Sequence, residues 1–453
     1  MGFTGPPDSA RSMLGIVVSR ADEASVHVGD RLRALVEWTA STDGSRPPAD
    51  GGGTVWRTDG AELRTFDGLH IELEGVAEPF DAPTHLAFAS RHSGDTGPLL
   101  TAHATGNFGP APYGGEPDRL AMAAPGAMAA AVDALAAHAP AGYEVGFECT
   151  HHGPTDLDVP SLFVEVGSAE EQWRDPAAAT AVAEAILALR GVEPLVERSF
   201  VGLGGGHYAP RFTRIVRETD WAVGHVAADW GLEAAGDARE TLLRQAFDRS
   251  GARLGVVDGD RPELVERVEG LGYRVVGERW LRETDGVPLR TVEAFEARLT
   301  TVDNGLRFGR PARTADDGST VEVREPAESL LAAVNAIDAG RVRDAVAAEA
   351  VAFETAEAGN RVAGRVAVAD HDAWARLEAS LVELLRERYV TVDVSAEAIE
   401  VTERVFDPER ARALGVEPGP AFGKLAGGAA VVVDGRPVAP EAVHVTRRHR
   451  FPR

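Results

Sequence analysis

Five side chains that can bind a metal or transfer a proton lie within nine positions, in the segment FECTHHGPTDLDV. They are Glu148, Cys149, His151, His152 and Asp156. An apolar, strand-like run ends at Phe147 just before them, and Pro154 in the segment and Pro160 after it prevent a helix. Neutral imidazoles and carboxylates are ligands that zinc favours. The segment therefore predicts a catalytic or metal site where a buried strand gives way to a loop.

Histidines follow two further apolar runs. THLAFAS leads into the glycine-rich segment RHSGDTGPLLTAHATGNFGPAPYGG, which begins with Arg91 and His92, and SFVGL leads into GGGHYAP, which contains His207. Ten of the 13 histidines precede residue 231. One buried histidine is more often a core residue than a ligand, but several at strand ends of one domain favour a shared site. Because glycine lets the backbone approach a ligand closely, both glycine-rich segments are predicted to bind substrate.

The chemistry that such a set favours is metal-dependent hydrolysis. Histidines with Glu148, Asp95 and Asp156 are predicted to hold one or two zinc ions, which lower the pKa of a bound water so that hydroxide attacks an ester or amide carbonyl. The sequence has neither the G-x-S-x-G motif of a serine nucleophile nor the H-E-x-x-H motif of zinc proteases. A thiolate pair of Cys149 with His151 or His152 is the less favoured alternative.

A sheet must hold these segments. The continuous apolar run LGIVVS at 14–19 is typical of a central parallel strand, and residues 21–38 have the periodicity of a helix. Further strands are predicted at LHIEL (69–73), THLAFAS (84–90) and SLFVEVG (161–167), and further helices at 118–138 and 175–191. The last helix begins with Asp-Pro and ends at a glycine, as helices commonly do. The alternation predicts an α/β fold with a mixed central sheet flanked by helices.

The chain of 453 residues is longer than one hydrophobic core usually organises. Residues 1–12 are rich in Gly, Pro and Ser and are predicted to be a disordered lead-in. Residues 13–285 form the predicted catalytic domain. In residues 286–453 histidines become rare and short strands mix with helices, which predicts a smaller α+β C-terminal domain.

Acidic residues dominate the charge of the chain. There are 71 Asp and Glu against 46 Lys and Arg, which gives a net charge of −25, and Lys424 is the only lysine. Such a composition is typical of a protein adapted to molar salt. The Debye length is then about 3 Å, so the net charge does not exclude RNA as a ligand. The single cysteine excludes an internal disulfide, and without a signal peptide or an apolar span we expect a cytoplasmic protein that contacts no membrane.

Six stretches of the sequence carry a family resemblance. They are GIVVSRADEASVHVGDRL; GGGTVWR; LHIELE; FASRHSGDTGPLLTAHATGNFGPAPYGG; VGFECTHHGPTDLDVPSLFVEVGS, followed by EEQW; and FVGLGGGHYAPRFT, followed by VGHV. In this order, across residues 13–285, they resemble the archaeal and plant type of D-aminoacyl-tRNA deacylase, in a haloarchaeal form with a C-terminal extension.

The resemblance implies a zinc-dependent hydrolase that cleaves the ester joining a D-amino acid, such as D-tyrosine, to tRNA. Such an enzyme proofreads the chirality of aminoacyl-tRNA and detoxifies D-amino acids. The resemblance also implies a fold similar to purine nucleoside phosphorylases and bacterial peptidyl-tRNA hydrolases. We expect tRNA as the partner, no DNA, and a monomer.

The expected site residues follow from the resemblance by position. The histidine motifs of the family fall on His92, His151, His152 and His207, which are the expected metal ligands, and His151 and His152 are also expected to be catalytic. Which of the four bind zinc stays open. Glu148 is expected to be a general base or a further ligand. The residues expected to bind substrate, some by cradling the terminal adenosine or its phosphates, are Asp95, Thr105, Gly106, Asn107, Phe108, Gly204, Gly205, Gly206 and Tyr208.

Residues 286–453 depart from the shorter members of that family. Their segment PGPAFGKLAGG resembles a short stretch of tRNA 3′-end processing endonucleases and contains Lys424, so we expect this part to help seat the acceptor stem. Two other functions stay open at this point: a nucleoside phosphorylase-like enzyme, which the glycine-rich segments favour, and a non-catalytic tRNA-binding protein. Phosphate-dependent release of a free base would identify the first, and binding without turnover the second.

Overall fold

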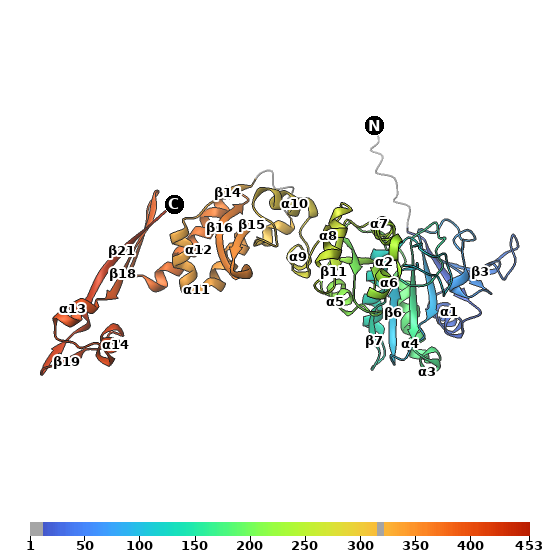
Figure 1. Cartoon of the computed structure of the whole chain (residues 1–453), viewed down its shortest axis with the longest axis horizontal. Helices are drawn as coiled ribbons and strands as arrows, with labels where there is room; N and C mark the ends of the chain where they lie inside the picture. The colour runs from blue at the N-terminus through green and yellow to red at the C-terminus, as the bar shows by residue number, and fades with distance from the viewer. Residues whose placement is uncertain (1–11, 315–320) are drawn as a thin grey trace, which may run out of the picture. The chain divides into compact units, whose positions relative to one another are not determined.

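The computed structural model describes residues 12–314 and 321–453. The chain divides into two compact units, Met1–Arg282 and Glu283–Arg453 (Figure 1). Residues 1–11 of the predicted lead-in lie outside the described residues. Ser12 is buried, and its hydroxyl donates a hydrogen bond to the carbonyl of Val192 at 2.9 Å, so this residue belongs to the fold and not to a disordered lead-in.

The first unit is built on an eight-stranded sheet with the order β2-β3-β4-β1-β5-β8-β6-β7. Its strands are β1 Leu14–Ser19, β2 Thr39–Asp43, β3 Gly53–Thr58, β4 Ala61–Phe66, β5 His85–Arg91, β6 Leu99–His103, β7 Glu144–Phe147 and β8 Ser161–Gly167. Strands β4, β1, β5 and β8 are parallel, whereas β6 is antiparallel to β8 and parallel to β7. The predicted mixed sheet is therefore confirmed.

The central strands are apolar because both faces of the sheet are covered. All six residues of β1 and all seven of β8 are buried. The main helices of this part are α1 Glu23–Leu35, α2 Pro125–His138 and α4 Pro176–Ala188, with the short α3 Glu170–Trp173 (Figure 1). Asp22 and Asp175 cap α1 and α4, each accepting a hydrogen bond from a backbone N–H of the first turn. The predicted helices at 21–38 and 175–191 are thus present, with shorter bounds.

A second, parallel sheet of four strands completes the first unit, with the order β10-β9-β11-β12. Its strands are β9 Ser199–Leu203, β10 Ala222–Ala227, β11 Leu254–Val257 and β12 Arg274–Val275, and its helices are α5 Pro210–Glu218, α6 Asp229–Ala234, α7 Arg239–Ser250, α8 Pro262–Gly270 and α9 Glu278–Glu283. We expected one central sheet, so this second sheet was not predicted.

The predicted strand LHIEL is wrong. Residues His70–Glu72 form a 3-10 turn, and His70 is buried with its Nε2 3.1 Å from the hydroxyl of Ser25 in α1. The histidine therefore anchors a connection across the start of α1.

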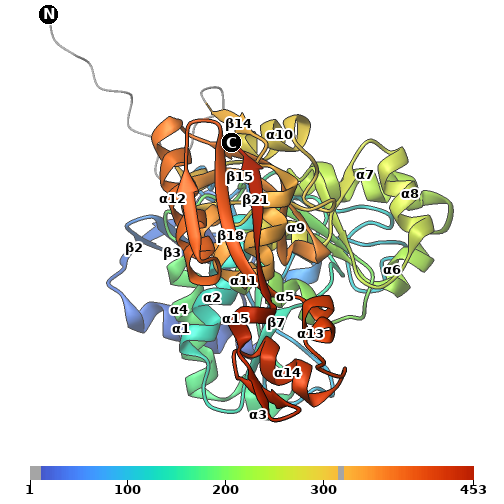
Figure 2. The same cartoon turned by 90° about the vertical axis from the view of Figure 1, so that its left-hand side faces the viewer.

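The second unit is α+β, as predicted. An antiparallel sheet with the order β13-β15-β16-β14 packs against α11 and α12, and β18 and β21 form a long antiparallel pair flanked by β17 (Figure 2). The bounds are α10 Leu289–Arg298, β13 Leu306–Phe308, β14 Glu322–Arg324, α11 Glu328–Glu349, β15 Ala350–Ala356, β16 Arg361–Val368, α12 His371–Arg388, β17 Thr391–Val394, β18 Ala398–Phe406, α13 Pro408–Ala413, α14 Pro420–Ala426, β19 Val431–Val433, β20 Arg436–Val438, α15 Pro440–Val443 and β21 His444–Pro452. Among the helices of the described residues, none combines the length and the apolar character that crossing a membrane requires.

Candidate active site

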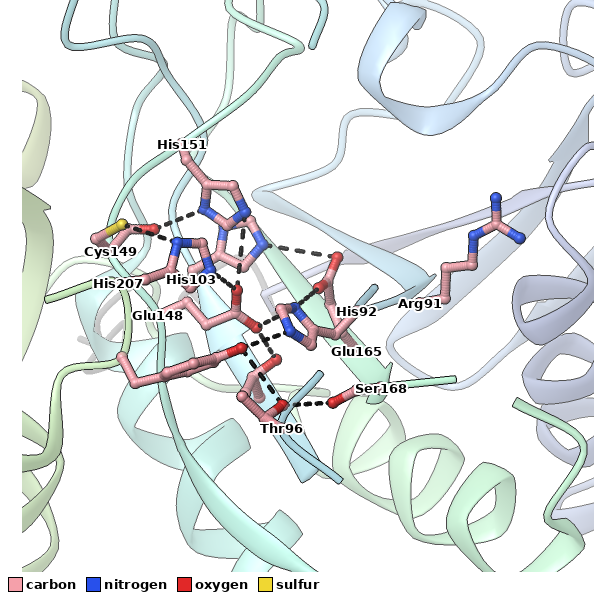
Figure 3. A network of polar contacts seen from close by, with 12 residues as sticks. Arg91, His92, Thr96, His103, Glu148, Cys149, His151, Glu165, Ser168 and His207 are labelled. Atoms are coloured by element: carbon pink, nitrogen blue, oxygen red, sulfur yellow. Dashed lines mark hydrogen bonds and ion pairs between the residues drawn. The ribbon is translucent and has the colours of Figure 1, made fainter. Parts of the chain in front are cut away.

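Glu148 lies at the centre of a buried polar cluster in the first unit (Figure 3). It follows β7 directly, and its Oε2 accepts a hydrogen bond from Nε2 of His207 at 2.7 Å. Its Oε1 is 3.1 Å from Nδ1 of His92 and accepts a hydrogen bond from the Thr101 hydroxyl at 2.5 Å. Nε2 of His151 is 3.7 Å from Oε2. One carboxylate therefore connects three of the four predicted histidines.

Three histidines beside this carboxylate share one orientation. Nδ1 of His103, of His151 and of His152 each lies at hydrogen-bond distance from a backbone carbonyl. The acceptors are the carbonyls of Ala104, Cys149 and Gly153, at 3.1, 2.8 and 2.7 Å respectively. A carbonyl only accepts, so each Nδ1 carries a hydrogen. Burial lowers the pKa of His151 and His152, so their Nε2 atoms keep a lone pair, whereas at His103 burial opposes protonation but Glu165 raises the pKa. Such hydrogen bonds from Nδ1 are how proteins orient imidazole as a metal ligand.

Glu165 and His103 belong to the cluster, although neither was predicted. Glu165 lies in β8 with its Oε1 3.6 Å from Nε2 of His103 and its Oε2 3.8 Å from Nδ1 of His92. The signal for Glu165 is a single carboxylate within the apolar strand SLFVEVG, because a buried charge requires a partner. The signal for His103 is its place at the end of the apolar run of β6.

Strand direction decides where the cluster forms. Because β6 is antiparallel to β8, Thr101 lies opposite Glu165, and His103 lies opposite Phe163. The rings of His103 and Phe163 stack with centroids 5.3 Å apart. The polar side chains thus gather over the face of β8, and not at one edge where the carboxyl ends of parallel strands meet. His207 joins them from the loop after β9, in the second sheet.

The electrostatics of the cluster favour a charged Glu148. Burial alone would raise the pKa of this carboxyl, but the hydrogen bonds from His207 and His92 outweigh burial and hold the pKa well below its usual value. Burial opposes protonation of His92, yet Glu148 raises its pKa above the ordinary value. Burial, together with the nearby His103, lowers the pKa of His151 to about 3. A carboxylate and a neutral imidazole therefore lie side by side.

Cys149 does not fit the thiolate alternative. Burial, reinforced by the charge of Glu148, raises the pKa of its thiol far above neutral pH. Its Sγ is 3.7 Å from Nδ1 of His207. A buried thiol of this kind is a poor nucleophile.

The residues present fit a metal ion. Four overlapping groups of three have ligand atoms within 4.8 Å of one another: His103, His151 and His152; Cys149, His151 and His207; His92, Glu148 and His207; and His103, Glu148 and Glu165. Nε2 of His103 is buried and has no hydrogen-bond partner within residues 12–314 and 321–453. An unsatisfied imidazole nitrogen among other nitrogen and carboxylate ligands is what a metal site requires.

Only some of the residues expected to bind substrate lie at the histidine cluster. The hydroxyl of Tyr208 is 2.8 Å from Nε2 of His92, so this side chain joins the site, and Asp95 is exposed on the loop after β5. Residues 105–108 are held within the fold, and their role in binding substrate stays a prediction. Phe108 is buried in an apolar cluster, and the Asn107 amide donates to two carbonyls of its own loop.

Two of the three glycines at 204–206 lie close to another segment of the chain. A Cβ on Gly204 or Gly205 would lie 2.9 Å from the carbonyl oxygen or Oδ2 of Asp258, respectively, and both glycines have positive φ. Within the part of the chain that the structure describes, they do not line the cavity above the histidines. Gly204 and Gly205 thus have a structural reason to be glycine, and the cradle for the adenosine stays a prediction.

A cavity of about 380 Å³ lies above the cluster. The cluster residues that line it are His92, His151, His152, Glu165 and His207. The other residues that line it are Asp22, Leu69, His70, Ile71, Ser90, Arg91, Ser93 and Tyr113. This cavity therefore gives a ligand access to the histidines.

Comparison with known proteins gives one consistent family. Residues 80–276 match the family model described as D-aminoacyl-tRNA deacylase. The D-aminoacyl-tRNA deacylase of Natronomonas pharaonis is 53% identical over 441 residues, which covers 97% of this chain and 100% of the relative. That of Halorubrum lacusprofundi is 52% identical and covers 97% of each chain. The crystal structure of AF0625, titled a conserved protein of unknown function, is 29% identical with a TM-score of 0.55 and covers 60% of this chain and 98% of that one.

Proposed function

Because this chain belongs to the D-aminoacyl-tRNA deacylase family, we propose that its buried histidine and glutamate cluster holds zinc and cleaves the ester between a D-amino acid and tRNA. The enzyme is a hydrolase of aminoacyl-tRNA esters, so the phosphorylase-like and the non-catalytic alternatives are set aside. D-Tyrosine is the first candidate for the amino acid. The products are free D-amino acid and tRNA, which can be charged again.

One observation carries this proposal: three imidazoles are oriented by backbone carbonyls beside a buried carboxylate. His103, His151 and His152 would hold a first zinc ion. His92 and His207 with Glu148 are a second candidate group. A bound zinc ion would supply a Lewis acid for the ester carbonyl and would lower the pKa of water.

The side chains themselves supply the proton transfers. Glu148 is unprotonated at neutral pH, as a general base must be, and the hydrogen bonds that lower its pKa also weaken it as a base. His207 bonds to Glu148 and has a side chain that is 33% exposed, so it connects the buried carboxylate with the cavity. From there its ring returns a proton to the ribose oxygen as the ester breaks. Tyr208 holds the ring of His92 from the opposite side.

The composition agrees with the source of the relatives. Several of them are from haloarchaea, and a net charge of −25 with a single lysine suits molar salt. We further propose that the enzyme acts as a monomer in the cytoplasm, where aminoacyl-tRNA is made.

The test is hydrolysis of D-tyrosyl-tRNA and L-tyrosyl-tRNA in molar KCl, before chelation, after chelation and after return of zinc. We expect loss and recovery of D-ester cleavage, with the L-ester spared throughout. His103→Gln should lower both the zinc content, measured by mass spectrometry, and the D-ester rate by about 100-fold or more. His138→Gln is the matched control, because His138 is half exposed and pairs with Glu184 outside the cluster. Absence of D-ester cleavage in fully metallated protein would disprove the proposal.

A further inference from the structure

Tyr113 is an exposed aromatic residue at the cavity above the histidines. Its side chain is 66% exposed, the largest value among the exposed large hydrophobic residues of the described part of the first unit. It lines the same cavity as His92, His151, His152 and His207. Exposure of an aromatic ring to water costs free energy, so an exposed ring at a substrate cavity is typical of a contact surface.

The loop that carries Tyr113 is held firmly in place. The carbonyl of Tyr113 accepts a hydrogen bond from the N–H of Gly153 at 3.1 Å, immediately after His152. The Asn107 amide donates to the carbonyls of Gly114 and Glu116 at 3.0 and 3.1 Å. A Cβ on Gly114 would lie 2.0 Å from the carbonyl oxygen of Ile71, so the backbones are in direct contact. The ring is thus presented at a fixed place, with little conformational entropy left to lose on binding.

Arg91 is the only lysine or arginine among the residues that line this cavity. Its guanidinium stacks on Trp173 at 4.7 Å, and its Nε is 4.0 Å from Oδ1 of Asp22. The terminal Nη atoms form no hydrogen bond with residues 12–314 or 321–453. Figure 3 shows this side chain directed away from the histidines. A planar cation with free donors, held on an aromatic ring, suits a phosphate group.

We propose that Tyr113 and Arg91 bind the terminal nucleotide of the tRNA, with the adenine stacked on the Tyr113 ring and the 5′-phosphate of that nucleotide at Arg91. This inference rests on the proposed function, because the ester bond lies on the ribose of the same nucleotide. When the ester reaches the histidines, its base and phosphate must occupy the rest of the cavity. Each of these two groups meets there the side chain whose chemistry recognises it.

The proposal replaces the expected cradle. Phe108 is buried and Asn107 is occupied by its loop, so neither contacts a base. The Asn107 amide instead holds the loop of Tyr113, through the carbonyls of Gly114 and Glu116.

The decisive experiment combines a variant with a changed substrate. D-Tyrosyl-tRNA is compared with the same ester on a tRNA whose terminal nucleotide lacks its base. Tyr113→Ala should lower kcat/KM for normal D-tyrosyl-tRNA by about 5- to 100-fold, which corresponds to loss of one base stack. On the baseless substrate the same variant should match the wild-type enzyme. Tyr113→Phe should keep nearly full activity on both, since the ring is retained.

Equal losses from Tyr113→Ala on both substrates, or no loss on either, would overturn the stacking assignment. Trp230→Ala is the matched control, because Trp230 is 48% exposed and lies outside the cavity lining, and it should change neither rate. If wild-type enzyme cleaves neither substrate, the proposed function itself has failed, and this result is visible without any variant.

The phosphate contact is tested with inhibitors. Adenosine 5′-monophosphate should inhibit the wild-type enzyme more strongly than adenosine does, and Arg91→Lys should remove most of that difference. Arg198→Lys is the control, because Arg198 also stacks on a tryptophan, Trp221, and pairs with Asp220. Equal inhibition of the wild-type enzyme by both compounds, or an unchanged difference in Arg91→Lys, would overturn the role of Arg91.

Discussion

Glu148 is ionised although it is buried, and burial disfavours a charged carboxylate. The carboxylate is stabilised by two imidazole N–H donors and by the Thr101 hydroxyl. Charge-assisted hydrogen bonds of this kind are stronger than neutral ones, which explains why they outweigh the cost of desolvation. The donors lie directly after β5, in β6 and in the loop after β9, so the ionisation of one residue depends on three separate segments.

His225 gives a prediction about pH at the same scale. Burial lowers its pKa from 6.5 to about 4, while its Nε2 donates to the Ala121 carbonyl and its Nδ1 accepts from Thr150. Between these values the unfolded chain binds a proton at His225 that the folded chain does not. This residue therefore costs no free energy of unfolding well above pH 6.5, and the free energy of unfolding falls as the pH drops below that value. From about pH 7 to pH 5 the wild-type free energy of unfolding should fall by roughly 2 kcal/mol more than that of His225→Gln.

Denaturant titrations at fixed salt would measure this difference for His225. His138→Gln changes an exposed histidine and should leave the slope of the wild type unaltered. Identical slopes for the wild type and His225→Gln would show that His225 is not held neutral by the fold.

The sequence predicted the kind of side chains in the site better than it predicted which residues meet there. His92, His151, His152, His207 and Glu148 lie together, because each ends or follows an apolar strand and this pattern is visible in the sequence. Two others were missed. His103 lies among many small residues in a long glycine-rich segment, and Glu165 lies within a strand, where a lone charge has no motif around it. Their roles depend on which strands are neighbours, and that is non-local information.

At the scale of elements, local patterns predicted β1, β5, β8, α1 and α4, because continuous apolar runs and helix caps are local signals. The segment at 69–73 has a strand-like composition but wraps across α1, where His70 finds its partner. The antiparallel direction of β6 and the separate second sheet could not be predicted, since both depend on long connections. These two features nevertheless decide that the site lies over the face of β8.

The loop behind Tyr113 gives a prediction at this scale. Gly114 and Gly191 have φ of +79° and +77°, but a Cβ on Gly114 meets the Ile71 carbonyl at 2.0 Å, whereas nothing lies within 4 Å at Gly191. Both alanine variants have the cost of a left-handed backbone, about 1 kcal/mol. Gly114→Ala must also move the loop, so it should lose more stability and lower kcat/KM for D-tyrosyl-tRNA at least tenfold. Thermal unfolding and kinetics of both variants check this, and equal losses would contradict it.

At the scale of the whole molecule, acidic charge and tRNA binding have to be reconciled. Many arginines are neutralised, as Arg450 is by Glu397 and Glu400. Arg447 and Arg448 on β21 are exposed and form no ion pair with the residues that the structure describes, and Lys424 lies in α14. In molar salt such local cations contribute at short range even on an acidic protein. They are the features of the second unit that support contact with the acceptor stem.

The role of the second unit is therefore a prediction about affinity. A chain that ends at Arg282 should bind D-tyrosyl-tRNA at least tenfold more weakly in molar KCl, while its rate on a D-tyrosyl trinucleotide stays the same. Arg447→Ala with Arg448→Ala in the full chain should reproduce part of the loss. Filter binding and single-turnover hydrolysis measure the two quantities. Full tRNA affinity in the shortened chain would remove the second unit from substrate binding.

His207 and Tyr208 reach the cluster from the loop after β9, and backbone hydrogen bonds such as Cys149 N–H to the His207 carbonyl, at 2.7 Å, tie that loop to the first sheet. During synthesis the first sheet leaves the ribosome before the second one is complete. Domains generally fold in that order, from the N-terminus onward. A nascent chain therefore has the first sheet before it has His207 and Tyr208 in place, and the site is complete only when the second sheet has folded.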